Sequence, residues 1–240
     1  MTWYFAVAER EHALQNPTSA EKVRLSGERM RLGPQSRLVD LAAGRGGPAI
    51  VLAEAFGCRI TCVERAPEFA AVARERAREA GLDELVDVVE ADARAFALEP
   101  EAYDATLCLG ASFVWEGLDG TLDALAPAVR PAGYVCVGEP FWRVWPLPDG
   151  ADAEGYVGLA ETVERIEAHG LPVVSLIAAS EDDWDRYETL HWQAVEEWLV
   201  EQPQDPDADR IAADYRRWKD EYLRVTRDRL GWAIFVAAKS

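Results

Sequence analysis

One stretch decides the fold: 39-VDLAAGRGGPAIVLAEAFGCRITCVER-65. An apolar strand runs into a glycine-rich loop, Pro48 opens a helix where its missing N–H is no loss, and Gly57 ends that helix. A second apolar strand follows and finishes on an acid, Glu64, about twenty residues after the first glycine. This order of elements is typical of a sheet that binds a nucleotide-containing cofactor at the carboxyl ends of its strands.

The alternation of apolar strands and amphipathic helices extends in both directions from this stretch. Strands are expected at 37–43, 59–64, 86–91, 104–110, 134–140 and 173–179, and helices at 48–57, 67–81, 119–129 and 156–169. Strands that alternate with helices pair in parallel, with helices on both faces of the sheet. The fold class is therefore α/β, with a Rossmann-like sheet that is mostly parallel.

The two ends of the chain depart from this rhythm. Residues 9–33 predict a helix, a break at Asn16-Pro17 and a second helix that Thr18 or Ser19 can cap. Near the other end, helices at 181–200 and 207–230 follow each other directly, and 232–238 is a seventh, antiparallel strand. We expect a single domain over 1–240, with a helical lid at 1–33, a cofactor-binding core at 36–180, a helical insert at 181–230 and the final strand at 232–239.

Composition restricts the possible partners. The chain of 240 residues carries a formal net charge of −18 and has a pI near 4.6, so it repels phosphate backbones and anionic membrane surfaces. We expect no nucleic-acid or membrane partner. Residues 181–210 contain eleven acids and two arginines, which indicates either a solvated helical face or a cleft rim that disfavours anionic substrates.

Cysteine and histidine usage indicates the compartment and argues against a metal. The four cysteines lie in or beside apolar runs without a Cys-x-x-Cys spacing, as expected of buried free thiols in the cytoplasm. The three histidines are far apart in sequence, which gives a Cys/His metal site little support. No stretch reaches 18 apolar residues, so no transmembrane helix is expected. We expect a cytoplasmic monomer or homodimer without a metal.

Two cofactors compete for the glycine loop. Gly44-Arg45-Gly46-Gly47-Pro48-Ala49 is compatible with the G-x-G-x-x-G/A loop that binds the pyrophosphate of NAD. Asp40, four residues before the first glycine, argues for a different ligand, because a carboxylate beside a pyrophosphate is unfavourable. It suits the ammonium and sulfonium of S-adenosylmethionine.

The chain resembles the class I S-adenosylmethionine-dependent methyltransferases. The motifs that carry the resemblance are 38-LVDLAAGRGG-47, Glu64, 90-EADARAF-96, 103-YDATLCLGAS-112 and 131-PAGYVCVGEP-140, in that order. Three further segments are similar to a narrower group of small bacterial methyltransferases of unassigned substrate: 12-HALQNPTSAEKVRLSGERMRLGP-34, 138-GEPFWR-143 and 182-DDWDRYETLHWQAVEEWL-199.

The resemblance implies roles for the residues at the strand ends. Backbone at Ala42, Gly44 and Gly46 would approach the methionyl part of the cofactor, and Asp40 would take its ammonium. Glu64 would accept from both ribose hydroxyls, with Arg65 beside the adenine. Asp92 and the Ala93 N–H would bind the adenine edge, and Gly110 and Ala111 would lie under the ribose and sulfonium. Bland alternatives remain: Asp40 as a turn residue, Glu64 as a surface acid, Asp92 as a helix cap.

The reaction implied is in-line transfer of a methyl group to a small-molecule acceptor, leaving S-adenosyl-L-homocysteine. A dry aromatic pocket favours it because charge disappears in the transition state. The candidate substrate residues are Phe113, Trp115, Trp142, Trp184 and Tyr187, with Phe141, Trp145 and Trp192 as further aromatic candidates, and each of them could equally be core. Glu139, His12 and His191 are candidate bases, and each could instead be structural.

Two motifs of nucleobase methyltransferases are missing from the sequence, which argues against a nucleobase as the methyl acceptor. Leu109-Gly110-Ala111-Ser112 stands where base-amino methyltransferases carry Asn/Asp-Pro-Pro-Tyr/Phe, and no Pro-Cys nucleophile is present. We expect a neutral or cationic, partly apolar small molecule. The alternatives are a nicotinamide-dependent oxidoreductase and a catalytically silent cofactor-binding protein.

Overall fold

The computed structural model describes residues 3–144 and 155–240 and contains one seven-stranded sheet of order β3-β2-β1-β4-β5-β7-β6. The strands are β1 (Arg37–Leu41), β2 (Arg59–Glu64), β3 (Val86–Glu90), β4 (Tyr103–Leu109), β5 (Val129–Trp142), β6 (Val173–Ala178) and β7 (Leu230–Ala238). Strands β1 to β5 pair in parallel, whereas β7 runs antiparallel to both β5 and β6. The predicted sheet, with its antiparallel last strand, is confirmed.

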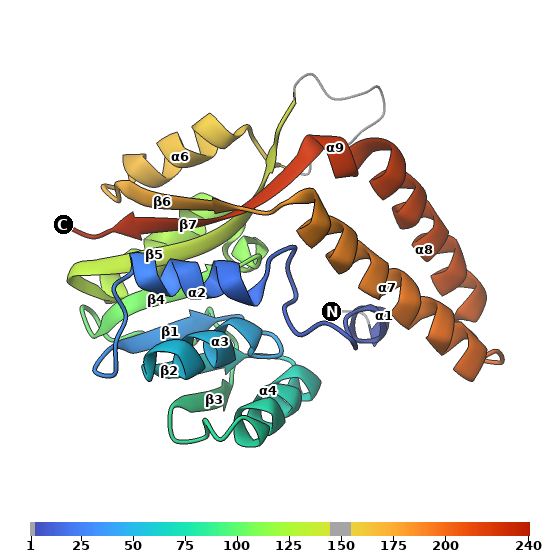
Figure 1. Ribbon diagram of the computed structural model, residues 1–240, viewed down its shortest axis with the longest axis horizontal. Coiled ribbons are helices and arrows are strands. Elements are labelled where there is room, and N and C mark those ends of the chain that lie inside the picture. The colour runs from blue at the N-terminus through green and yellow to red at the C-terminus, as the bar shows by residue number, and fades with distance from the viewer. Residues whose placement is uncertain (1–2, 145–154) are drawn as a thin grey trace.

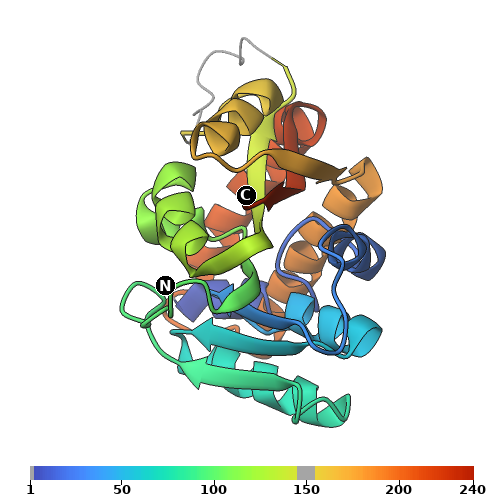
Figure 2. The same ribbon diagram turned by 90° about the vertical axis from the view of Figure 1, so that its left-hand side faces the viewer.

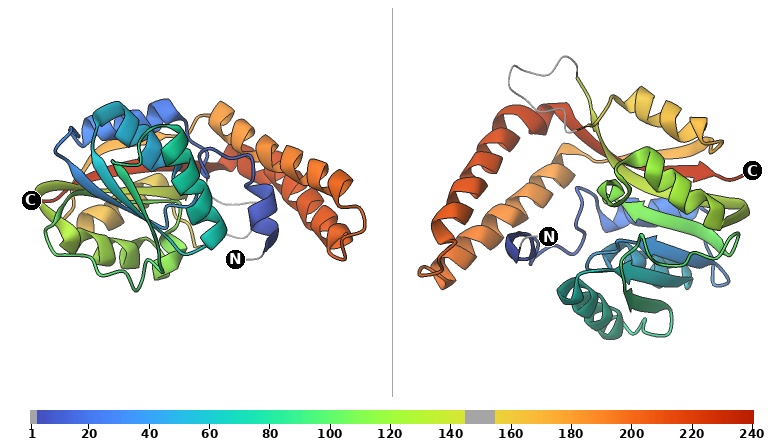
Figure 3. Two further views of the ribbon diagram at one scale, coloured as in Figure 1. Left: turned by 90° about the horizontal axis from the view of Figure 1, so that it is seen from below. Right: turned by 180° about the vertical axis from the view of Figure 1, so that it is seen from behind.

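Helices cover both faces of the sheet (Figures 1 and 2). Figure 3 shows α2 (Ala20–Arg29), α3 (Gly47–Phe56) and α4 (Pro67–Glu79) on one face and α5 (Leu118–Leu125) and α6 (Leu159–Ala168) on the other. Each face closes its own apolar core: Leu38, Ile60 and Leu107 point to the first layer, and Val39, Val63 and Cys108 to the second. The alternation along β1, β2 and β4 therefore buries both faces of the central strands.

A third helical group extends beyond the carboxyl ends of the strands (Figure 1). It consists of α1 (Trp3–Ala8), α7 (Glu181–Glu201), α8 (Ala208–Glu221), a π-helical turn (Tyr222–Thr226) and the short α9 (Arg227–Arg229). The predicted capping box begins α7: the Ser180 hydroxyl accepts from the Asp183 N–H, and the Asp183 carboxylate accepts from the Ser180 N–H. A small core of Ala8, Val195, Trp198, Ile211 and Tyr215 joins α1, α7 and α8.

Two sequence expectations need correction. The helix expected after residue 8 is wrong, because α1 ends at Ala8 and residues 9–19 form turns and bends. The carbonyls of Glu9 and Arg10 accept from the Arg45 side chain, and the only helix-like bond that the Glu9 carbonyl makes among the described residues is a single turn to the His12 N–H at 3.1 Å. The helix expected to reach residue 129 ends at Leu125 and is followed by a 3-10 turn (Ala126–Ala128), after which β5 begins.

Other boundaries differ by smaller amounts. Ser19, one of the two expected caps, starts α2 by accepting from the Lys22 N–H at 3.2 Å. The long helix expected at 207–230 is divided into α8, the π-helical turn and α9. Within residues 3–144 and 155–240, no helix combines the length and the apolar character that crossing a bilayer requires.

Candidate active site

A cavity of about 890 Å³ lies at the carboxyl ends of β1, β2 and β4. The glycine loop between β1 and α3 forms its floor, and residues 92–94 after β3 form one side. Gln15, Asn16 and Pro17 from the N-terminal segment and Trp184 and Tyr187 from α7 lie over it. Nine of the ten residues predicted to bind the cofactor line this cavity: Asp40, Ala42, Gly44, Glu64, Arg65, Asp92, Ala93, Gly110 and Ala111.

The glycine loop has an unusual backbone conformation. Ala42 and Gly44 have φ values of +56° and +55°, in the left-handed region. A Cβ on Gly44 would collide with the amide oxygen of Gln15, which accepts from the Arg45 N–H at 2.7 Å. The loop is therefore covered by backbone and side chain of the N-terminal segment, and glycine is needed for that close approach.

Gly46, the tenth predicted residue, is not among the described residues that line the cavity. Its φ is +72°, and a Cβ there would meet Ala73 of α4 at 3.0 Å. The position of Gly46 thus allows close packing of the loop on α4, and Gly47 lies at the cavity wall in its place.

Asp40 is the buried acid of the site. Its side chain is only 2% exposed, and its Oδ2 atom has no hydrogen-bond partner. Burial, followed by the nearby charge of Glu64, raises the pKa of Asp40 from 3.8 to about 7. A carboxylate in this state gains most from a cationic ligand, because such a ligand would offset the desolvation of the charge.

Glu64, at the end of β2, organises the loop next to it. Its Oε2 atom accepts from the Gly44 N–H at 2.9 Å, and its Oε1 atom accepts from the Ala66 N–H at 2.7 Å. Each carboxylate oxygen retains acceptor capacity, so the group can hold two backbone amides and still accept from a ligand in the cavity. Glu64 is therefore not a plain surface acid, since it is 6% exposed.

Asp92 and Gly110 mark two other strand ends. Asp92 is exposed, and its Oδ1 atom accepts from the Arg94 N–H at 3.0 Å in a short turn after β3. Gly110 has a φ of +77°, and a Cβ there would collide with the side-chain oxygen of Asn16. The Asn16 amide donates to the Leu109 carbonyl at 2.9 Å, so the N-terminal segment is attached to the end of β4.

The aromatic residues divide into two groups. Phe113, Trp184 and Tyr187 line the cavity. Trp115 and Trp142 are not among its described lining residues: Trp115 packs against the core on the α5 face, and Trp142 is 5% exposed at the end of β5. Trp145 lies outside the described residues. Tyr156 and Trp232 also line the cavity and were not singled out from the sequence.

Glu139 lies in a second cavity of about 400 Å³ that shares Gly110, Phe113, Pro140 and Tyr156 with the first. The Ser112 hydroxyl donates to Glu139 Oε2 at 3.0 Å, and Oε1 is buried without a partner. Burial raises the pKa of Glu139 from 4.5 to about 7, although the hydrogen bond from Ser112 opposes this shift.

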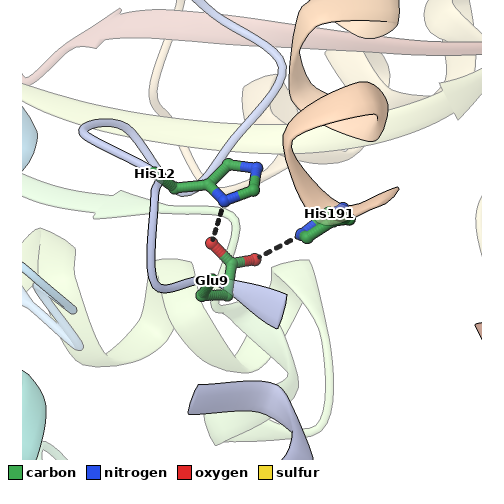
Figure 4. Close-up of side chains that lie close together, drawn as sticks. All are labelled: Glu9, His12 and His191. Carbon is green, nitrogen blue, oxygen red and sulfur yellow. Dashed lines mark hydrogen bonds and ion pairs between the residues drawn. The ribbon is translucent and has the colours of Figure 1, made fainter. Parts of the chain in front are cut away.

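The two candidate histidines meet each other, and neither is among the described residues that line the two cavities. His191 Nε2 is 3.0 Å from Glu9 Oε1, and His12 Nδ1 is 3.5 Å from Glu9 Oε2 (Figure 4). Burial is the main reason that the pKa of His12 is lowered. The Tyr187 hydroxyl donates to Glu9 Oε1 at 3.2 Å and thus connects this group to the cavity wall. His12 and His191 are far apart in sequence, but the fold brings their rings to a centroid distance of 4.3 Å.

Sequence reasoning missed the residues of the N-terminal segment. Gln15, Asn16 and Pro17 line the cavity, and Glu9 joins the histidines. No periodic pattern marks these positions, because they act through contacts with strand ends far along the chain. The sequence predicts a lid at 1–33 that contains the Asn16-Pro17 break, but from this segment only His12 is a predicted site residue, and none of Glu9, Gln15, Asn16 or Pro17 is.

Comparisons with known proteins show which family the chain is similar to. Residues 38–133 match the family model of a methyltransferase domain. The chain is 29% identical to the uncharacterized protein YjhP of Escherichia coli strain K12, over 97% of this chain and 96% of that protein. Two crystal structures of S-adenosylmethionine-dependent methyltransferases in complex with S-adenosyl-L-homocysteine are also similar. The protein from Thiobacillus denitrificans is 29% identical with a TM-score of 0.94, and that from Geobacter sulfurreducens is 30% identical with a TM-score of 0.92. All of this chain and 99% of each of those chains are covered.

The sheet order, the antiparallel β7 and the carboxylates at successive strand ends define a Rossmann-like domain of the methyltransferase type. The chain belongs to the S-adenosylmethionine-dependent methyltransferase family, whose members use that cofactor as methyl donor.

Proposed function

We propose that this protein transfers the methyl group of S-adenosylmethionine to a small-molecule acceptor bound between the two connected cavities. The observation that carries the proposal is Asp40, a buried carboxylate with an unpartnered oxygen at the wall of an 890 Å³ cavity. The ammonium of the methionyl group is the complement of this carboxylate, whereas the pyrophosphate of a nicotinamide cofactor would repel it.

The other strand ends supply the remaining cofactor contacts. Glu64 accepts from the ribose hydroxyls while it keeps its bonds to the Gly44 and Ala66 amides. Asp92 and the Ala93 N–H bind the adenine edge, and Arg65 flanks the ring. Gly110 and Ala111, which line the cavity at the end of β4, lie under the ribose and sulfonium.

The acceptor lies on the side where Phe113 and Tyr156 border both cavities. Glu116, Asp119 and Glu139 make the second cavity acidic, with Arg165 as its cation, and Arg165 is paired with Glu161 at 2.8 Å. These charges favour a neutral or cationic acceptor that carries an apolar part against Phe113, Trp184 and Tyr187. Four free thiols support a cytoplasmic location.

Glu139 is the general base of the proposed reaction. Its pKa of about 7 is close to the pH at which a base accepts a proton most effectively, and Ser112 orients one oxygen while the other is available. The rate of transfer should rise with pH through about 7, as Glu139 ionises. Glu139→Gln should remove this rise and leave the affinity for the cofactor within about threefold, since Glu139 does not line the cofactor cavity.

Two measurements test the proposal. Calorimetry with S-adenosylmethionine, S-adenosyl-L-homocysteine and NAD should show one site for the first two and none for NAD. Formation of S-adenosyl-L-homocysteine, followed over a panel of amines, alcohols, thiols and carboxylates, should then identify an acceptor. Binding of NAD in preference to the adenosyl compounds would refute the cofactor assignment, and cofactor binding without transfer to any class of acceptor would favour a silent binding protein.

A further inference from the structure

Three side chains from distant parts of the chain form a buried group beside the cofactor cavity. Glu9 follows α1, His12 lies in the N-terminal segment, and His191 belongs to α7. One ligand-type atom of each lies within 4.8 Å of the others. Figure 4 shows the two imidazole rings turned toward opposite oxygens of the same carboxylate.

The hydrogen bonds of the group leave two acceptors facing each other. His12 Nε2 lies 2.9 Å from the Tyr187 carbonyl oxygen, which can only accept, so the ring proton is on Nε2. With the ring neutral, Nδ1 of His12 presents a lone pair to Glu9 Oε2 at 3.5 Å, which is beyond the usual range of a hydrogen bond. Both atoms are buried without a partner, in side chains that are 2% and 0% exposed.

The other Glu9 oxygen has hydrogen-bond partners, so the group's missing partners are confined to His12 Nδ1 and Glu9 Oε2. Glu9 Oε1 accepts from the Tyr187 hydroxyl at 3.2 Å and lies 3.0 Å from His191 Nε2. Buried unpaired acceptors are costly, and a cation between them would remove the cost for both at once.

The spacing and chemistry of the atoms match a first-row transition metal. Ligands at about 2.0–2.1 Å in a tetrahedral zinc site lie about 3.3 Å from one another. Glu9 Oε1 lies 3.0 Å from His191 Nε2 and Glu9 Oε2 lies 3.5 Å from His12 Nδ1, and a set of one atom from each residue falls within 4.8 Å. Two imidazoles with one carboxylate suit Zn²⁺, Fe²⁺ or Co²⁺ better than Mg²⁺ or Ca²⁺, which prefer oxygen ligands.

The surroundings provide the support that metal ligands usually have. The Nε2–H of His12 donates to a backbone carbonyl, and the Glu9 carboxylate accepts from Tyr187. Glu188 is a further acid near His191 and Glu9, and Arg45 is the nearby cation. The Arg45 side chain is itself occupied by the carbonyls of Glu9 and Arg10.

We propose that Glu9, His12 and His191 bind one divalent transition-metal ion of the zinc class. The ion joins the N-terminal segment to α7. Gln15 to Pro17 of that segment and Trp184 and Tyr187 of α7 all line the cofactor cavity. The metal site therefore links the N-terminal segment to α7, the two elements that lie over the cofactor cavity, and we call this link the clasp. It takes no part in the transfer chemistry.

Metal binding is tested on the full-length protein after chelator treatment. Titration with Zn²⁺ or Co²⁺ should show one equivalent per chain, and Co²⁺ should develop the visible ligand-field absorption of a nitrogen-ligated ion. His12→Ala and His191→Gln should each weaken binding by at least about 100-fold, because loss of a ligand costs more than the roughly 10- to 100-fold that loss of a ligand's hydrogen-bond partner costs. His169→Ala is the matched control, because that ring pairs with Asp119 and Asp123 elsewhere, and it should bind metal like the wild type.

Glu9→Gln separates a metal site from a merely hydrogen-bonded cluster. The amide can donate to His12 Nδ1 and still accept from Tyr187, so the metal-free variant should melt at or above the wild-type temperature while its metal binding is lost. Failure of the wild type to bind Zn²⁺ or Co²⁺ stoichiometrically would overturn the proposal. Binding that survives in both histidine variants would do so as well, because the ion would then lie elsewhere. His191→Gln, at a partly exposed position, decides the matter if Glu9→Gln fails to fold.

The clasp has a second readout, which rests on the proposed function. Zn²⁺ should tighten the binding of S-adenosyl-L-homocysteine severalfold in the wild type and not in His191→Gln, and the cofactor product should tighten Zn²⁺ by the same factor. Metal binding without this coupling would overturn the proposal that the ion links the two covering elements, while the proposal of a metal site would stand. Lack of cofactor binding would instead count against the proposed function, since stoichiometry and the Co²⁺ spectrum need no cofactor.

Discussion

Replacing Asp40 by asparagine should make the protein more stable and a poorer cofactor binder. The pKa of Asp40 is about 7 in the folded protein, against an ordinary value of 3.8, a difference of about 3 pH units. At 1.36 kcal/mol per pH unit, the buried charge costs about 4 kcal/mol of unfolding free energy above pH 7. The unfolded chain ionises at lower pH than the folded one, so this cost begins near pH 3.8, grows until pH 7 and then stays constant.

The size of the effect can be measured without knowing how the asparagine amide is accommodated. At pH 5 the cost is about 1.5 kcal/mol, so the stability gained by Asp40→Asn should be about 2.5 kcal/mol larger at pH 8 than at pH 5. The amide contributes equally at both values and cancels. Urea denaturation at the two pH values gives the difference, with Asp92→Asn, which changes an exposed acid near another strand end, as the control.

Cofactor binding completes this test. Asp40→Asn should weaken S-adenosyl-L-homocysteine at least tenfold, which corresponds to the loss of about 1.4–3 kcal/mol for a hydrogen bond to a charged group. An equal stability change at both pH values would refute the burial argument. Unchanged affinity in the variant would refute the pairing of Asp40 with the ammonium.

Three other substitutions test separate parts of the structure. Glu64→Gln should lower the affinity for S-adenosyl-L-homocysteine by about 10- to 100-fold in calorimetry, because it removes a charged acceptor, and an unchanged affinity would argue against ribose binding. Gly110→Ala should weaken cofactor binding more than Gly81→Ala, since only the first adds a collision with the N-terminal segment to the strain of a positive φ. Equal affinities for the two variants would contradict the role of that segment as a cover. Ser180→Ala should cost about 1 kcal/mol in thermal or urea unfolding by removing the cap of α7, and a loss below about 0.3 kcal/mol would show that the cap is redundant.

The strand ends could be predicted from the sequence because their signals are local. Asp40 lies near the end of one apolar strand and Glu64 ends the next, and parallel strands bring such positions to one edge of the sheet. The glycine loop, the Pro48 helix start and the Ser180 cap likewise depend on residues a few positions apart. In the structure the glycine loop does lead into α3 with Pro48 in its first turn, and Ser180 does cap α7.

The cover of the cavity could not be predicted in the same way. Residues 9–19 have no regular hydrogen-bond pattern of their own, and their conformation depends on Arg45, on Arg76 and on the end of β4. Arg76 donates to the Ala13 carbonyl at 3.0 Å across 63 positions of sequence. Such contacts exist only after the sheet has formed, so the meeting of His12 with His191 was equally hidden.

The place of α7 and α8 between β6 and β7 has a consequence for how this architecture can diversify. Ala178 of β6 pairs with Ala233 of β7, so the whole helical excursion is the connection of one antiparallel hairpin. The entropic cost of closing such a connection rises only slowly with its length. The helices between β6 and β7 can therefore be exchanged for another connection, in evolution or by engineering, while the register of the two strands stays fixed. Such an exchange would replace Trp184 and Tyr187 at the cavity wall and leave the residues at the ends of β1, β2 and β3 in place.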